Sequence, residues 1–227
     1  MKKYLIINKN KYFNNKFKNT KKKKFFFINK KKDLNLKKLS KIQPNLIFFP
    51  HWSHIIKKKV LKKYNCIGFH STPLPYGRGG SPIQNMIKRG FSKTKICAFK
   101  MEASIDGGPI YIKTELSLNG NASNIMDRMY VLIYEMIIKL SDSTPKSKKQ
   151  TGRVVTFKRL TKKDSEIKMR KKLNLKSLYN LIRMLDAKDY NYPNAYIRLK
   201  NFDIRFTDAK ITKNKLIAKA TFSKSKI

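Results

Sequence analysis

The sequence predicts an α/β protein: a Rossmann-like domain with a mainly parallel sheet, plus a small C-terminal extension of a helix and strands. Short apolar runs that suit buried strands alternate with amphipathic segments through the first hundred residues. Polar or Pro/Gly-rich turns follow these runs. After residue 153 the pattern changes to one helical face and two alternating, strand-like runs. At 227 residues and 41% apolar composition, the chain is long enough to bury a real core.

In the N-terminal half, apolar runs alternate with helical faces. Four runs are predicted to be buried strands: Tyr4–Ile7, Phe25–Ile28, Leu46–Phe49 and Cys66–Phe69. A short helix is expected in the basic stretch between the first two strands, and longer ones over 34–42 and from His54 to Lys63. This alternation indicates a parallel sheet, whose functional site lies at the carboxyl ends of the strands. His51 and His70 both fall at such an end.

The second half begins with a loop, Ser71–Ser81, whose prolines and glycines predict rigid turn structure rather than a helix. The elements expected after it are a helix over Pro82–Arg89, strands over Thr94–Met101 and Pro109–Leu116, and a core-facing helix from Ile125 to Leu140. The expected domains are a catalytic domain over 1–142, a polar linker over 143–152 and a small α+β extension over 153–227. The extension holds a helical face over 175–185 and strand patterns near 202–206 and 216–222.

The formal net charge of +41 comes from 54 basic and 13 acidic residues. Such a charge favours contact with phosphates. Arginine, which suits bidentate phosphate and base contacts, occurs nine times, and the other 45 basic residues are lysines. A chain rich in Lys, Asn, Ile and Phe is typical of an AT-rich genome. We therefore interpret the lysine excess as compositional, and nucleic acid as a partner that the sequence does not favour.

The cysteines and histidines indicate neither a disulfide framework nor a metal centre. Cys66 and Cys97 lack C-x-x-C spacing and lie in apolar runs, where reduced, buried thiols are expected. His51 and His54 resemble a metal pair, but no carboxylate or thiolate at suitable spacing completes it. The apolar run Tyr4–Ile7 is too short for a signal-peptide core and no long apolar span follows, so a cytoplasmic protein without a membrane association is expected.

The stretch 66–110 carries the residues that suit proton transfer. His70 ends an apolar run directly before the Pro/Gly-rich loop, and Asp106 lies in a Gly-rich turn between two strands. An isolated histidine is usually a structural residue, and Asp-Gly-Gly is ordinary turn chemistry. Two titratable groups that face each other across a loop are, however, what acid–base catalysis requires.

The same stretch resembles the folate-dependent formyltransferases, in which an H-x-S-x-L-P loop is followed by D-x-G-x-I. The matching residues are His70, Thr72, Leu74, Pro75, Asp106, Gly108 and Ile110. Ser71 lies one place before the usual hydroxyl position, and the resemblance covers roughly residues 34–210. It implies that His70 stabilises the oxyanion or shuttles a proton, and that Asp106 accepts the proton of the attacking amine.

The resemblance also implies the cofactor, 10-formyltetrahydrofolate as formyl donor. The residues expected to contact its pterin are Phe49, Pro50, Trp52, Ile105 and Gly107. The expected contacts to the acceptor substrate are Thr72, Arg78 and Gly79 in the Gly-rich loop.

One catalytic position departs from the family. These enzymes usually carry N-x-H, and the asparagine donates to the oxyanion, whereas this chain has Gly68 there. Loss of one such donor costs roughly 10²–10³-fold in rate unless another replaces it. The candidates are the hydroxyls of Ser71 or Thr72, a loop amide, or Asn85. Asn65 points to the opposite face of the strand.

The pattern F-P-H-W, then H-x-x-x-L-P-x-G-R-G-G-S-P, resembles the members of this family that act on sugars. The resemblance implies an N-formyltransferase that acts on the amine of a nucleotide-linked amino sugar. One alternative is methionyl-tRNA formyltransferase, which normally carries a longer C-terminal barrel than the roughly seventy-five residues after the linker. Another is a catalytically inactive formyltransferase-like domain that binds nucleic acid or anions. The sequence leaves the oligomeric state open, a homodimer included.

Overall fold

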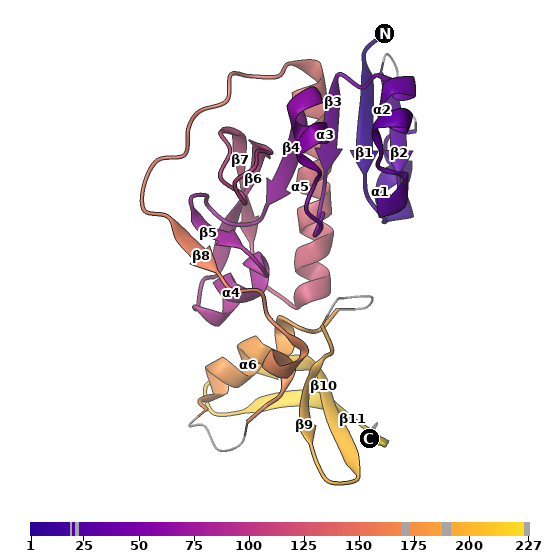
Figure 1. Ribbon diagram of the computed structural model, residues 1–227. Coiled ribbons are helices and arrows are strands. Elements are labelled where there is room, and N and C mark those ends of the chain that lie inside the picture. Colours follow the sequence, from indigo (N-terminus) through magenta and orange to yellow (C-terminus); the bar gives the residue numbers. More distant parts are fainter. Residues whose placement is uncertain (19, 21–22, 169–172, 188–191, 225–227) are drawn as a thin grey trace. The chain divides into compact units, whose positions relative to one another are not determined.

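A computed structural model describes residues 1–18, 20, 23–168, 173–187 and 192–224 (Figure 1). The chain forms two compact units that interleave along the sequence. The first unit comprises 1–78, 95–116 and 129–156, and the second comprises 79–94, 117–128 and 157–227. The division 1–142, 143–152 and 153–227 stays a prediction.

The first unit is built on a six-stranded sheet with the order β2-β1-β3-β4-β6-β7. Its strands are β1 (Lys3–Ile7), β2 (Lys24–Ile28), β3 (Leu46–Phe49), β4 (Cys66–His70), β6 (Lys93–Lys100) and β7 (Ile110–Ser117). The pairs β1/β2, β1/β3 and β3/β4 are parallel, and β4 pairs antiparallel with β6. The Rossmann-like, mainly parallel sheet is therefore confirmed.

Helices cover both faces of this sheet. In the described part of the chain, the helices are α1 (Lys11–Asn15), α2 (Leu36–Ile42), α3 (Lys58–Lys63), α4 (Pro82–Lys88), α5 (Ala122–Asp142) and α6 (Leu175–Arg183). Two 3-10 turns lie at Lys31–Asp33 and Lys162–Ser165. Leu39 of α2 and Val60 of α3 pack with the face that carries Leu5 and Phe49. On the other face, the Tyr4 hydroxyl donates to a carbonyl at the C-terminal end of α5, and rings of α1 contact rings of α5.

Two local expectations were wrong. The helix predicted from His54 begins only at Lys58, and the residues before it belong to no helix or strand. There Ile56 is 6% exposed and Ile55 is 88% exposed. The buried Ile56 side chain anchors the segment in the core. The loop 71–81 contains a strand, β5 (Tyr76–Gly79), which pairs with β8 (Val155–Phe157).

The second unit contains α4, α6 and a three-stranded antiparallel sheet with the order β11-β10-β9. Its strands are β9 (Ala195–Arg198), β10 (Phe202–Ile211) and β11 (Leu216–Lys224). This arrangement confirms the expected C-terminal helix and strands. Among the described residues, no helix is both long enough and apolar enough to span a bilayer.

Arg183 at the end of α6 ties the second unit together. Arg183 is 7% exposed, and its Nη1 donates to the carbonyls of Leu118 (2.5 Å) and Gly120 (2.9 Å). Its Nε donates to Asn180 Oδ1 at 2.9 Å. Burial lowers the pKa of Arg183 from its ordinary value, although the guanidinium stays charged at neutral pH.

We expect Arg183→Ala to lower the free energy of unfolding by about 2–4 kcal/mol, because it leaves buried carbonyls without their charged donor. Chemical denaturation followed by circular dichroism measures this change. Arg159→Ala is the matched control, since Arg159 is an exposed arginine of the same unit, and little change is expected there. Equal effects of the two substitutions would contradict the role of Arg183.

Candidate active site

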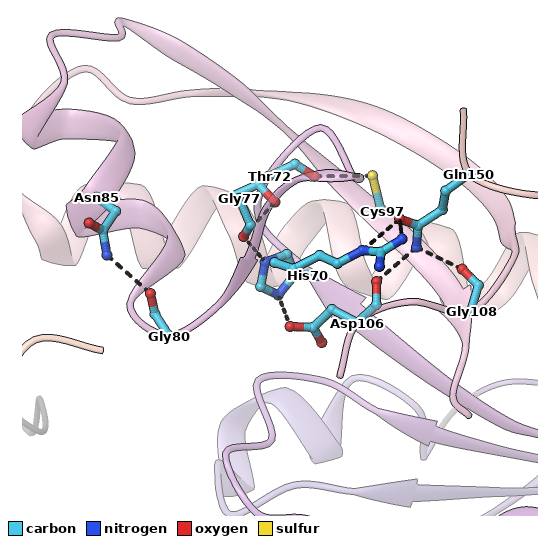
Figure 2. Close-up of polar contacts among 10 residues, drawn as sticks. His70, Thr72, Gly77, Gly80, Asn85, Cys97, Asp106, Gly108 and Gln150 are labelled. Atoms are coloured by element: carbon cyan, nitrogen blue, oxygen red, sulfur yellow. Dashed lines mark hydrogen bonds and ion pairs between the residues drawn. The ribbon is translucent and has the colours of Figure 1, made fainter. Parts of the chain in front are cut away.

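His70 lies at the carboxyl end of β4, where the side chain is 8% exposed. Its Nε2 is 2.7 Å from the carbonyl oxygen of Gly77, and the Thr72 hydroxyl donates to the same oxygen at 3.2 Å (Figure 2). Because a carbonyl oxygen can only accept, this contact assigns a proton to Nε2. The loop that follows β4 therefore orients the imidazole.

The other ring nitrogen faces Asp106. His70 Nδ1 is 3.5 Å from Asp106 Oδ2, and the Asp106 side chain is 20% exposed. An imine nitrogen and a carboxylate oxygen are both acceptors, so this pair is suited to hold one proton between them. With the proton on His70, Asp106 is a carboxylate that can serve as a base. The structure thus brings together the two residues predicted to be catalytic.

The turn that carries Asp106 has an unusual backbone. Asp106 has a φ of +49°, in the left-handed region that costs energy for a residue with a side chain. A Cβ atom at Gly108 would lie 1.8 Å from the Lys100 carbonyl oxygen, so this position requires glycine. Gln150 supports the turn: its Nε2 donates to the carbonyls of Asp106 and Gly108, both at 2.8 Å. Gln150 lies in the segment 143–152 that was predicted to be a linker, and no motif singles it out.

The residues predicted to contact the acceptor lie in or beside the loop after His70. Thr72 is fully buried, and its carbonyl accepts from Cys97 Sγ at 3.1 Å. Burial raises the pKa of Cys97 to about 11, so this thiol is protonated at neutral pH and can donate. Arg78 donates to Gln150 Oε1 through Nε and Nη2, and Gly79 has a φ of +99°. Their contact with a substrate stays a prediction.

The residues predicted to contact the pterin fall into two groups. Phe49 and Pro50 are buried, and the Phe49 ring packs edge-on against Trp52 with ring centroids 6.1 Å apart. Trp52 presents a buried indole nitrogen that has no hydrogen-bond partner among the described residues. Ile105, beside Asp106, is 69% exposed. A flat ring with an unused donor and an exposed apolar side chain fit a heterocycle that carries hydrogen-bond acceptors, as a pterin does. The contact of these residues with the pterin stays a prediction, as does that of Gly107.

A neighbouring ring occupies the position of the missing oxyanion donor. Gly68 lies directly opposite Phe99 across β4 and β6. A Cβ atom at Gly68 would lie 2.8 Å from two atoms of the Phe99 ring and 3.1 Å from Met101 Cγ. The Phe99 ring therefore fills the space that a side chain at position 68 would need.

The three side chains considered as replacement donors all have protein partners. The Ser71 hydroxyl donates to Met129 Sδ at 3.3 Å, and the Thr72 hydroxyl donates to Gly77. The amide nitrogen of Asn85 donates to three backbone carbonyls of its own unit. An oxyanion contact from any of them would need one of these bonds to break.

The other two histidines contact aromatic rings. The His51 ring lies 6.3 Å from that of Tyr130, and the His54 ring lies 5.1 Å from that of Trp52. Within the part of the chain that the structure describes, no group of three or more His, Cys, Asp or Glu side chains could hold a metal ion.

Comparison with known proteins places the chain in a family. The family profile described as formyl transferase matches residues 2–136, more than half of the chain. The chain belongs to the formyl transferase family. A second profile, methionyl-tRNA formyltransferase C-terminal domain, matches residues 162–223.

Its relatives support this membership. It is 29% identical over 191 residues to the methionyl-tRNA formyltransferase of Thermodesulfovibrio yellowstonii, covering 80% of this chain and 60% of the relative. It is 30% identical over 186 residues to that of Thermotoga maritima, covering 78% and 57%. The chain thus spans about 60% of the length of these relatives.

Solved structures show the same fold. The methionyl-tRNA formyltransferase from Clostridium thermocellum is similar with a TM-score of 0.92 and 35% identity, over 99% of this chain and 100% of that chain. A 4-N formyltransferase from Francisella tularensis has a TM-score of 0.68 at 17% identity, over 88% and 93%. At that identity the likeness shows the fold alone.

The prediction of a nucleotide-linked amino sugar as the acceptor was therefore wrong. The C-terminal profile matches the region that the sequence analysis considered too short for a methionyl-tRNA formyltransferase. The loop motif was interpreted as a substrate-binding motif, but its polar groups bond within the protein. The Thr72 hydroxyl donates to the Gly77 carbonyl, and the Arg78 guanidinium donates to Gln150.

We expect Gly68→Ala to lower the free energy of unfolding by about 1–3 kcal/mol, because the new methyl group overpacks against the Phe99 ring. Urea denaturation measures the loss. In a Phe99→Leu background the same substitution is expected to cost less, since the opposing ring is gone. An equal loss in both backgrounds would show that Phe99 is not the cause.

Proposed function

We propose that this chain transfers a formyl group from 10-formyltetrahydrofolate to the amino group of methionyl-tRNA. The observation that carries the proposal is the match of residues 162–223 to the C-terminal domain of methionyl-tRNA formyltransferases. The His70–Asp106 pair supplies the acid–base chemistry that the transfer needs. The bound folate would supply the formyl group, and Trp52 and Ile105 are the residues that would contact it.

Asp106 is the base in this proposal. Its carboxylate takes a proton from the aminoacyl ammonium, which leaves a neutral amine able to form a bond to the formyl carbon. The bond from that carbon to the donor nitrogen would then break, the attacking nitrogen would lose a second proton to the departing nitrogen, and Asp106 would release its proton to solvent. His70 faces the Asp106 carboxylate through Nδ1, and its protonated form would favour the electron density that gathers on the formyl oxygen.

The composition supports a nucleic-acid substrate. The +41 charge suits a polyanion, and lysine can neutralise phosphates without bidentate geometry. We therefore revise the interpretation of the lysine excess: part of it would serve tRNA binding. An inactive, anion-binding module remains a competing function, motivated by Gly68.

We expect His70→Ala and Asp106→Asn to lower kcat for formyl-methionyl-tRNA formation by about 10²-fold or more, because each removes one partner of the proton-holding pair. Acid-gel separation of formylated from unformylated aminoacyl-tRNA measures turnover. Asp106→Asn keeps the side-chain shape, so its thermal unfolding is expected to match that of the unaltered chain. Full turnover in both variants would refute the assignment, and tRNA binding without turnover by the unaltered chain would favour the inactive module.

We expect the KM for methionyl-tRNA to rise by about tenfold or more when salt is raised from about 50 to about 200 mM, because lysine–phosphate contacts release counterions. Turnover at saturating tRNA is expected to stay within about twofold, since the transfer itself takes place between buried or half-buried groups. Initial-rate kinetics at several salt concentrations separate the two quantities. A KM that does not respond to salt would contradict binding through phosphates.

A further inference from the structure

We propose that Gln150 is the positioning residue for Asp106. The segment 148–150, here called the strap, would hold the catalytic turn, residues 104–108, in place. The proposal rests on the proposed function, because the reaction that needs Asp106 is formyl transfer. It adds a residue from the segment that sequence reasoning treated as a linker.

The Gln150 side chain uses both ends of its amide (Figure 2). Its Nε2 donates two hydrogen bonds of 2.8 Å, to the carbonyls of Asp106 and Gly108. Its Oε1 accepts from Arg78, at 3.1 Å from Nε and 2.7 Å from Nη2. One half-buried side chain thus joins the catalytic turn to the arginine of the loop after His70.

The turn needs this support. Asp106 has a φ of +49°, which strains a residue with a side chain. The hydrogen bond inside the turn, from Gly107 N to the Ser104 carbonyl, is long at 3.4 Å. Ile105 is mostly exposed and adds little packing. The two bonds from Gln150 therefore hold the backbone on both sides of Gly107 and limit how far the carboxylate can move from His70.

Backbone pairing presents Gln150 to the turn. Lys148 N donates to the Ile110 carbonyl at 2.9 Å, and Ile110 N donates to the Lys148 carbonyl at 2.8 Å. This bridge attaches the strap at the first residue of β7, just after the turn. Lys149, one residue before Gln150, is exposed. The strap thus begins on the strand that ends the turn.

The chemistry requires an amide. Glutamate could accept from Arg78 but would set a carboxylate against two carbonyl oxygens, and it has no donor for them. Lysine could donate to the carbonyls but could not accept from Arg78. Glutamine offers two donors and an acceptor on one rigid group, which matches the four bonds seen here.

We expect Gln150→Ala and Gln150→Glu each to lower kcat by about 10- to 100-fold, because a base misplaced by about 1 Å loses activity on this scale. The KM for either substrate is expected to change less than about threefold, since neither donor bond goes to a substrate. Lys149→Ala is the matched control, with a kcat like that of the unaltered chain. Retained activity in Gln150→Glu alone would mean that the Arg78 contact matters and the contact with the turn does not.

A double-mutant cycle with Asp106→Asn separates positioning from general stability. If Gln150 acts through Asp106, Gln150→Ala causes no further loss of kcat in the Asp106→Asn background. Losses that multiply in full would overturn the proposal, as would unaltered kcat in Gln150→Ala.

Amide hydrogen exchange over 102–110 tests the strap without relying on activity. We expect exchange there to quicken by about tenfold or more in Gln150→Ala and to stay unchanged in Lys149→Ala. If the unaltered chain formylates nothing but exchange over 102–110 still differs between the two variants, the proposed function is wrong. The proposal that Gln150 stabilises the turn is then still supported. Unaltered exchange in Gln150→Ala would refute the proposal that Gln150 stabilises the turn, whatever the enzyme activity.

Discussion

The 3.5 Å contact between His70 Nδ1 and Asp106 Oδ2 is the interaction on which the rest of the site depends. Parallel strand pairing delivers His70 to the carboxyl edge of the sheet, and the Gly77 carbonyl holds the far side of the ring. Asp106 comes from the turn between β6 and β7, whose own hydrogen bond from Gly107 N to the Ser104 carbonyl is long at 3.4 Å. Its position is stabilised by glycines that allow the bend and by Gln150, whose amide bonds the turn's backbone.

The site also shows how a core can replace a polar group. Phe99 packs where a side chain at position 68 would begin, and the neighbouring hydroxyls and amide considered as substitutes bond to protein atoms. In the proposed reaction, stabilisation of the formyl oxygen would therefore fall to His70 rather than to a side-chain amide at position 68.

Much of the architecture could be predicted because its signals are local. Apolar runs of four or five residues revealed the strands from Tyr4 to Phe69, and spacing of 3.6 residues revealed the long helix later seen as α5. The segment before α3 was predicted as helix because its signal is only two residues long, with Ile55 exposed and Ile56 buried. The acceptor was mispredicted for a different reason. A motif in the loop was interpreted as substrate recognition, whereas Thr72 bonds to Gly77 in the same loop and Arg78 bonds to Gln150.

The sequence by itself determined the order of the elements, the family motif and the two titratable residues, because periodicity, turn chemistry and residue type are properties of short segments. Only the tertiary structure decided which groups those residues meet. Gln150 lies 44 residues from Asp106 along the chain, and Phe99 lies 31 residues from Gly68, so their contacts depend on sheet order and strand register. Hydrogen bonds and packing of that kind are set by where strands pair, which no local pattern encodes.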